Sequence, residues 1–192
     1  IKDDGSVITW GRRNDGGELS STISLLAQDV TQIFTSSNGF AALNSDGSVA
    51  AWGGTTGMPP SSLKNVVDIS STNSAFAALT ENGSVVPWGT SYAGGELKVF
   101  YGLDIANGVP LSASTLESGV VEVFSTIHAF AALKEDGSVI TWGHADSGGD
   151  NKEVLTSLSS DVKTVYSTRQ AFAALKNDGS VITWGGSGNG TF

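Results

Sequence analysis

One phrase of fifteen residues, repeated along the chain, most constrains how the chain folds. AFAALKEDGSVITWG at 129–143 returns almost letter for letter at 171–185, and weaker copies stand at 39–53 and 75–89. The chain opens inside a further copy, IKDDGSVITWG, at residues 1–11. Supersecondary units repeated every few tens of residues are typical of propellers, solenoids and arrays. The phrase is therefore predicted to build the fold rather than to perform chemistry.

The spacing of this phrase divides the chain into units. One apolar position in it is occupied by Ile1, Leu43, Leu79, Leu133 and Leu175, at steps of 42, 36, 54 and 42 residues. Residues 1–192 are therefore expected to form a single repeat domain or a fragment of one. The approximate units are 1–43, 44–79, 80–133, 134–175 and a partial 176–192.

Each unit is expected to contain three short strands. The stretch VVEVFST at 120–126 alternates apolar and polar residues, as a half-buried strand does. AFAAL is a continuous apolar run that fits a strand buried on both faces. Asp-Gly or Asn-Gly then marks a hairpin, because glycine accepts positive φ without steric cost, and SVITWG is the third strand. The fold class is predicted to be all-β, a propeller-type repeat of three-stranded antiparallel blades. The structural turn glycines are Gly47, Gly83, Gly137 and Gly179.

Tryptophan occupies one register of the third strand in every unit. An isolated surface Trp would point to sugar stacking, but five identical placements favour a structural role. We expect each ring to pack between neighbouring sheets, with about 200 Å² of its surface buried. The five residues are Trp10, Trp52, Trp88, Trp142 and Trp184.

The repeat resembles that of the regulator-of-chromosome-condensation family. The resemblance rests on ALKEDGSVITWG, on the VxxV strand before it, and on Gly-Gly-Asp or Gly-Gly-Glu six residues after Trp. It implies a β-propeller, which has seven blades in the family. The family's His before Ala-Leu is matched only by His128, displaced by two residues, and the short units look more like those of bacterial members. Five third strands against four first and second strands favour a segment of a larger propeller or array over a small closed ring.

Composition excludes several classes of partner. The net charge is −9, and Lys and Arg together number only 10. A basic face for nucleic acid or for an anionic membrane surface is therefore not expected. The absence of Cys excludes disulfides and thiolate zinc sites. No apolar run approaches the roughly 20 residues of a membrane-spanning helix, so membrane insertion is not expected either.

Two sets of loops vary between units, whereas the Asp-Gly turn barely changes. They are the turn between the first two strands and the loop that follows Trp-Gly. The alternating strand directions place both sets at one end of the sheets. Loops on a rigid frame often carry binding sites, although neutral drift in exposed turns would give the same variation. The candidate binding residues are Arg12, Arg13, Tyr92, Phe100, Tyr101, His128, His144, Arg169 and Gln170.

The third link spans 36 residues, twelve more than the first and last links, which span 24 each, whereas the second spans 18. The extra residues of the third link lie near ELKVFYGLDIANGVP at 96–110, and Phe100 and Tyr101 at their centre suit either an interface anchor or local packing. The helix-like stretches at 18–30 and 112–120 are expected to cover outer blade edges.

Signals of catalysis are weak. His144, Asp146 and Ser147 include the residue types of a triad, but neighbours in one loop rarely reach that geometry. His128 has no second His at metal-ligand spacing, and the Asp-Gly turns lack the further ligands of a calcium loop. The chain is therefore predicted not to be an enzyme, and no metal or cofactor is assigned to it.

The leading hypothesis is a non-enzymatic binding or structural repeat module of a secreted or surface bacterial protein. It would present its variable loops to a protein or a glycan, as in adhesion, or stack against further repeats of the same array. An alternative implied by the resemblance is a protein inhibitor of a secreted enzyme, similar to the β-lactamase-inhibitory propellers. Nucleotide exchange with chromatin binding, which the eukaryotic members perform, fits the acidity and the short units least.

Overall fold

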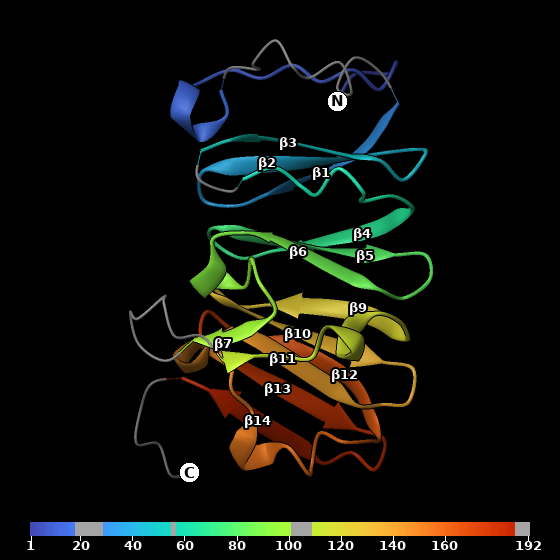
Figure 1. Ribbon diagram of the computed structural model, residues 1–192, viewed down its shortest axis with the longest axis vertical. Helices are drawn as coiled ribbons and strands as arrows, with labels where there is room; N and C mark the ends of the chain where they lie inside the picture. The colour runs from blue at the N-terminus through green and yellow to red at the C-terminus, as the bar shows by residue number, and fades with distance from the viewer. Residues whose placement is uncertain (18–28, 55–56, 101–108, 187–192) are drawn as a thin grey trace.

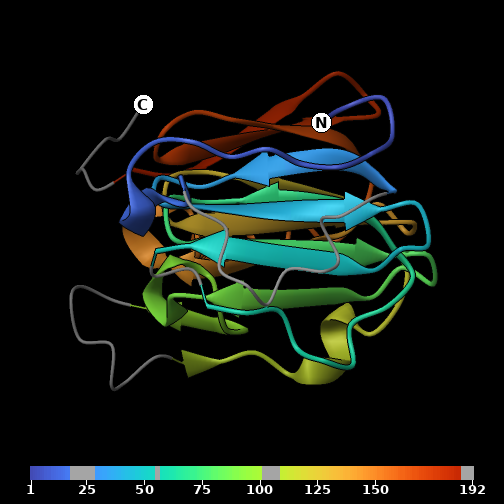
Figure 2. The same cartoon turned by 90° about the horizontal axis from the view of Figure 1, so that it is seen from above.

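The computed structural model describes residues 1–17, 29–54, 57–100 and 109–186. Four β-sheets follow one another along the chain and stack as layers, with the N-terminal segment beyond the first sheet (Figure 1). Figure 2, which looks along the stack, shows the layers overlapping face to face. The first and fourth sheets lie at opposite ends, so the described residues form an open, partial propeller. Their helices are short 3-10 turns, and none is long or apolar enough to cross a membrane.

Each sheet contains the three antiparallel strands that the repeat predicts. The first two sheets are β1 (Val30–Thr35), β2 (Gly39–Asn44) and β3 (Val49–Gly53), then β4 (Val66–Ser71), β5 (Ala75–Thr80) and β6 (Val85–Gly89). The third and fourth are β9 (Val120–Ser125), β10 (Ala129–Lys134) and β11 (Val139–His144), then β12 (Val162–Ser167), β13 (Ala171–Lys176) and β14 (Val181–Gly185). The prediction of an all-β repeat of three-stranded blades is confirmed.

The longer link adds two strands to the third sheet. β7 (Lys98–Phe100) runs parallel to β11, with Val99 opposite Gly143, and β8 (Val109–Pro110) pairs with β7. The insertion therefore covers the outer edge of this sheet. The stretch at 112–120 contains the 3-10 turn η4 (Ala113–Leu116), and its Leu116 is buried in the core between the second and third sheets. Residues 18–28 lie outside the described ranges.

Successive sheets are joined through the start of each first strand. Asn65 has a positive φ of 54°, and the N–H of Val66 after it donates a 3.0 Å hydrogen bond to the carbonyl of Gly47 in the preceding Asp-Gly turn. A β-bulge follows, and the extra residue, Val67, is exposed. Asp, Asn and Gly tolerate positive φ better than other residues, which explains their occurrence before Val in every unit. The equivalent pairs elsewhere are Val30–Gly5, Val120–Gly83 and Val162–Gly137.

The apolar core lies between the sheets. Alternate residues of a strand point to opposite faces, so AFAAL sends Phe and one Ala towards the preceding sheet and its other residues towards the next. Small Ala side chains at this layer let the sheets approach closely. Between the third and fourth sheets, the buried core is Ala129, Ala131, Leu133 and Val139 against Val162, Val165, Phe172, Ala174 and Trp184.

The Trp rings dock onto the loop of the preceding unit. Trp142 stacks on Phe130, and its indole N–H donates a 3.0 Å hydrogen bond to the carbonyl of Gly94. A Cβ on Gly94 would lie 2.5 Å from the Phe130 ring, which explains why glycine stands there. The same bond joins Trp52 to Gly16 and Trp184 to Gly148. The Gly-Gly motif after Trp is therefore a receptor for the next unit's Trp, a role that the sequence analysis did not assign.

Two Trp residues depart from the expected equivalence. Trp10 is 83% exposed, so the expectation that all five rings are buried was wrong for this one. Among the described residues, nothing covers its outer side, and the one regular element of residues 1–17 is the 3-10 turn η1 (Arg13–Asp15). Trp88 is buried, yet its indole N–H has no partner in the described part of the chain. The loop before it, 54–62, lacks the Gly-Gly motif.

Candidate functional site

The sheets present two different ends. At one end, which we call the loop face, lie the turns between first and second strands (36–38, 72–74, 126–128 and 168–170) and the loops after Trp-Gly. Three of these loops form the 3-10 turns η1 (Arg13–Asp15), η3 (Ser91–Ala93) and η5 (Ala145–Ser147), of which η1 and η3 stand at the left of Figure 1. The Asp-Gly turns lie at the opposite end, which we call the Asp-Gly face.

A backbone ladder fixes the spacing of the turns on the loop face. The N–H of Ser37 donates to the carbonyl of Asn73, that of Asn73 to Ile127, and that of Ile127 to Arg169, at 2.8–3.0 Å. Each bond joins one sheet to the next. The turns are therefore held at regular intervals by backbone hydrogen bonds, and this spacing does not depend on the side chains that the turns carry.

The post-Trp loops are tied to the same turns. The hydroxyl of Thr126 donates to the carbonyl of Ser147 at 2.8 Å, and that of Thr72 donates to Ala93 at 2.9 Å. The N–H of His144 donates to the carbonyl of His128 at 2.9 Å. Variable residues of the two loops are thereby brought beside each other by contacts that do not depend on their side chains.

A cluster of variable side chains forms where the second, third and fourth sheets meet on this face. The Tyr92 and His128 rings meet edge to face with centroids 5.4 Å apart, and the centroids of His128 and His144 are 6.3 Å apart. Burial, together with the positive charges of His144 and Arg169, holds the pKa of His128 below its usual value. These four residues, Tyr92, His128, His144 and Arg169, are called the loop-face cluster below.

The other sequence candidates are not members of this cluster, although two of them are next to it. Arg12 precedes η1 and Arg13 is its first residue; both are exposed, and Arg12 pairs with Asp15 at 3.8 Å. Gln170 is exposed next to Arg169, and its carbonyl accepts the N–H of Gly186. The backbone of Phe100 pairs with His144 through β7. Tyr101 lies outside the described residues.

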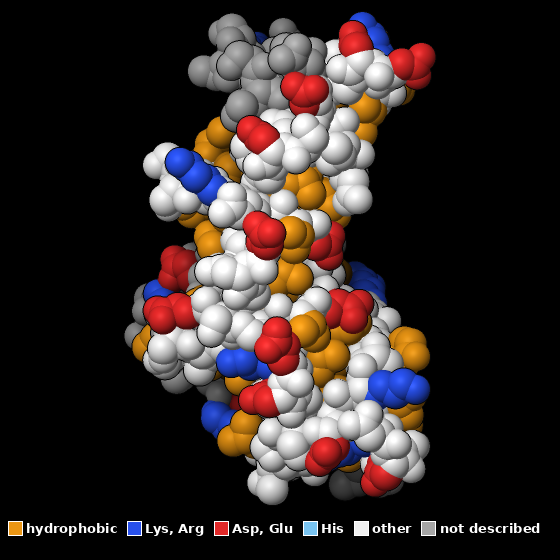
Figure 3. All heavy atoms as spheres, turned by 90° about the vertical axis from the view of Figure 1, so that its right-hand side faces the viewer, with side chains coloured by type: hydrophobic (Ala, Val, Ile, Leu, Met, Phe, Trp, Pro, Cys, Tyr) orange, Lys and Arg blue, Asp and Glu red, His pale blue; other side chains and the backbone are white. Residues whose placement is uncertain are grey.

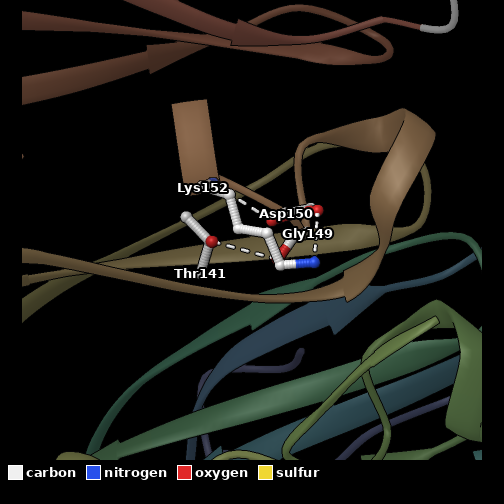
Figure 4. Close-up of polar contacts among 4 residues, drawn as sticks. All are labelled: Thr141, Gly149, Asp150 and Lys152. Atoms are coloured by element: carbon white, nitrogen blue, oxygen red, sulfur yellow. Dashed lines mark hydrogen bonds and ion pairs between the residues drawn. The ribbon is translucent and has the colours of Figure 1, made fainter. Parts of the chain in front are cut away.

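Asp150, the acidic residue after Gly-Gly in the link that follows β11, has a structural role in that link. In Figure 4, the hydroxyl of Thr141 donates to the carbonyl of Gly149 at 3.0 Å, which holds the loop against β11. Asp150 accepts the backbone N–H of Lys152 at 3.1 Å and pairs with its ammonium group at 3.3 Å. This carboxylate therefore fixes the start of η6 (Lys152–Val154), the next turn of the link.

The Asp-Gly face carries many carboxylates, and those of the turns accept hydrogen bonds within their own turn. Carboxylates recur along it between apolar side chains (Figure 3). Asp136 accepts the N–H and the hydroxyl of Ser138 at 2.9 and 2.6 Å, and these bonds lower the pKa of Asp136. Asp178 and Ser180 form the same pair. Within the described ranges, no group of three or more His, Asp or Glu could hold a metal ion.

His144, Asp146 and Ser147, which include the residue types of a catalytic triad, do not form a nucleophilic site. Ser147 is among the most buried polar residues, and its carbonyl accepts the Thr126 hydroxyl under the loop. A substrate carbonyl cannot reach a hydroxyl packed in this layer. Its neighbour Asp146 is exposed on the outside of the same turn.

Comparison with known proteins agrees with this geometry. No family model matches the chain, and no curated protein matches it. Among solved structures, the chain is similar to Prp20p from Saccharomyces cerevisiae, with a TM-score of 0.59 and 18% identity over 92% of this chain and 52% of Prp20p. Human WBSCR16 is similar with a TM-score of 0.57 and 16% identity, over 92% of this chain and 56% of WBSCR16. The CRINKLY WD40 ectodomain of the Arabidopsis thaliana receptor kinase ACR4 is similar with a TM-score of 0.53 and 14% identity. The match covers 82% of this chain and 56% of the ectodomain.

The fold and these likenesses define a class. The chain has a propeller-type repeat fold, the kind of frame that supports binding and structural modules. More narrowly, its fold is that of the RCC1-like β-propeller, of which yeast RCC1 (Prp20) is an example. The chain spans about half the length of the structures it matches.

Proposed function

We propose that the chain is a non-enzymatic, protein-binding repeat module whose partner contacts the loop-face cluster. The observation that carries the proposal is the way the cluster is built. Side chains from loops of the second, third and fourth sheets meet there. Backbone hydrogen bonds hold the turns that carry them, so the side chains can differ between units without loss of the frame. Aromatic and Arg side chains are also the types that contribute most to protein interfaces.

The chemistry of the cluster favours a protein surface that offers carboxylates. Its phenol and two imidazoles supply hydrogen-bond donors, and its guanidinium supplies five donors and a permanent positive charge. They stand on a chain whose net charge is −9, so they provide a local contrast that would orient an acidic partner. The similar structures support a protein partner in kind: Prp20p was studied for its binding to Gsp1p and histones, and it was also solved bound to Kap60.

Comparative capture with matched variants tests the proposal. The bait proteins are the unaltered chain, a loop-face variant carrying Tyr92→Ser, His128→Ala and Arg169→Ala, and a control carrying Glu81→Ala, Glu135→Ala and Lys163→Ala. The control positions are exposed at the opposite end of the sheets. Proteins bound from an extract of the source cells are identified, then purified and titrated against each bait by calorimetry.

A partner of the proposed kind binds the unaltered chain and the control within about twofold, and the loop-face variant about tenfold more weakly or worse, as loss of interface anchors requires. Equal binding to all three baits, or loss with the control alone, would place the binding surface elsewhere. An extracellular or bacterial-surface location, a glycan ligand and inhibition of a secreted enzyme remain predictions from the sequence.

A further inference from the structure

Three side chains that are cationic when protonated gather in the loop-face cluster. The centroids of the His128 and His144 rings lie 6.3 Å apart, and the charge of Arg169 acts on His128 from the turn of the next sheet. The main chain holds the three segments together. The N–H of His144 donates to the carbonyl of His128 at 2.9 Å, and that of Ile127 donates to the carbonyl of Arg169 at 2.8 Å. The cationic groups are therefore gathered by bonds that make no use of their charge.

The charged groups that act on the His128 imidazole, among the described residues, are all cationic. His144 and Arg169 both oppose its protonation, and so does its burial. Glu96, which follows η3, is hydrogen-bonded to a serine hydroxyl at 2.7 Å and paired with a lysine. Asp146 of η5 is exposed. Like charges held close together cost free energy unless an anion joins them, so the arrangement favours an anionic ligand.

Partial burial strengthens the attraction of the cluster for an anion. His128, His144 and Tyr92 are partly buried, and the Tyr92 ring stands edge to face against His128 with centroids 5.4 Å apart. Arg169 is exposed, so a ligand can approach the cluster from solvent. Coulomb attraction grows as the local dielectric constant falls. An anion is therefore held more strongly here than by a single hydrated surface charge.

A phosphoryl group fits this set of donors better than a carboxylate does. It carries a charge of about −1.5 to −2 near pH 7 and three acceptor oxygens, whereas a carboxylate carries one charge on two oxygens. A guanidinium offers paired N–H donors to an oxyanion, and each protonated imidazole adds donors from a different segment of the chain. The two imidazoles and the guanidinium together bear up to three positive charges, most of which a single carboxylate would leave uncompensated.

We propose that His128, His144 and Arg169 bind the phosphoryl group of a phosphorylated protein partner, with the Tyr92 phenol beside them as a further donor. The partner in this statement rests on the proposed function. The phosphoryl site rests on the side chains of the chain itself, so it can be tested without a partner. Inorganic phosphate has the same chemistry and should enter the same site.

Occupancy of the site and protonation of its imidazoles are linked. A bound dianion favours the charged form of each ring, so binding should take up protons, and protonation should tighten binding by the same factor. The effect belongs near pH 6.5, about where an unperturbed imidazole titrates. Attraction through the overall charge of the chain cannot produce this effect, since the net charge is −9.

NMR titration of the His rings at about pH 7 tests the site. The chain contains only two His residues, His128 and His144, so the ring signals report directly on the cluster. The probes are N-acetylphosphoserine amide, inorganic phosphate and, as a carboxylate of similar size, N-acetylglutamate amide. The chains are the unaltered protein, His144→Gln, Arg169→Gln and the control Arg12→Gln, which removes the same charge from another exposed Arg of the loop face.

The unaltered chain and Arg12→Gln should bind both phosphates saturably, with dissociation constants that agree within about twofold, and bound phosphate should raise the titration midpoint of His128. His144→Gln and Arg169→Gln should each bind about tenfold more weakly, which is the scale of losing one charge-assisted hydrogen bond. The proposal is overturned if N-acetylglutamate amide binds as tightly as N-acetylphosphoserine amide, if phosphate leaves the His signals unchanged, or if both variants bind like the unaltered chain.

Phosphatase treatment distinguishes failure of this proposal from failure of the proposed function. A partner that binds the unaltered chain but not the loop-face variant should bind about tenfold more weakly once it is dephosphorylated. Unchanged binding after treatment would overturn the phosphoryl site and leave the protein-binding function in place. Small phosphates that bind the cluster, while every captured protein binds the loop-face variant as well as the unaltered chain, would overturn the protein partner.

Discussion

The indole N–H of Trp142 in the third sheet donates a 3.0 Å hydrogen bond to the carbonyl of Gly94 in the loop of the preceding unit. Gly94 has a φ of 93° and lies against the Phe130 ring, which stacks on Trp142 with centroids 5.2 Å apart. The glycine serves the junction twice, since its carbonyl binds the indole and its missing Cβ leaves room for the Phe ring.

Replacement of Gly94 should be more costly than replacement of Gly179, the turn glycine of the fourth sheet. In Gly94→Ala, the new methyl group would stand 2.5 Å from the Phe130 ring, in addition to the strain of positive φ. Gly179→Ala has a similar φ of 87° but meets nothing within 4 Å. We expect urea unfolding to give a loss of about 1–2 kcal/mol for Gly179→Ala, and a further 1–3 kcal/mol or so for Gly94→Ala from overpacking. Equal losses would show that backbone strain alone explains the glycine.

Truncation of two Trp residues in the same repeat register should have opposite outcomes. Trp142 is fully buried, so Trp142→Ala should lower the free energy of unfolding by about 3–5 kcal/mol. Trp10 projects into solvent, and Trp10→Ala should change it by no more than about 0.5 kcal/mol when measured on dilute, monomeric protein. A large loss for Trp10→Ala would show that the ring packs on the chain in solution.

Trp142 and Trp88 are both buried, but only the indole N–H of Trp142 has a hydrogen-bond partner among the described residues, so the pair tests the contribution of that bond. Trp142→Phe removes the donor to Gly94, whereas Trp88→Phe removes a buried N–H that has no partner among the described residues. The change in side-chain volume is the same. Trp142→Phe should therefore cost about 1–3 kcal/mol more than Trp88→Phe, which is the scale of leaving a buried carbonyl unsatisfied. Identical costs in chemical denaturation would mean that the Trp88 indole finds a partner.

The sequence was sufficient to predict the sheets because it states the same pattern several times. The alternating apolar and polar residues, the AFAAL run and the Asp-Gly turn predict the same strand boundaries in each copy. The local strand and turn preferences therefore agree with the overall fold of stacked sheets. The order of strand directions was likewise enough to place both variable loop sets on one face. Each of these inferences depends only on residues close together in the chain.

The remaining features depend on neighbours that the pattern does not encode. Trp10 has the same sequence context as Trp142, yet its burial is decided by what lies on its outer side. Gly94 receives a ring that is 48 residues away, and only its fixed distance from Trp88 could have signalled this role. The parallel pairing of β7 with β11 arises from an insertion that occurs once. The approach of Tyr92 to His128 depends on loop side chains that differ from unit to unit.

His128 provides a prediction about pH. Burial is the main cause that holds the pKa of this imidazole below its ordinary value, and the charges of His144 and Arg169 act in the same direction. The folded state therefore binds fewer protons at this site than the unfolded state between the folded pKa and about 6.5. Stability should fall as pH decreases through that window, and this contribution should level off below the folded pKa.

Titration of the His128 ring signals by NMR measures the effect directly. We expect a midpoint below about 6.5 in the folded chain, and an upward shift in His144→Gln and in Arg169→Gln, because each removes a positive charge from the surroundings. The shift should be partial in both variants, since burial is the largest cause and remains. Lys163→Gln, a charge change on the Asp-Gly face, should leave the midpoint unchanged. A His128 midpoint at or above the ordinary value would mean that the imidazole is fully hydrated in solution, and that the loop-face cluster does not hold it between Tyr92 and His144.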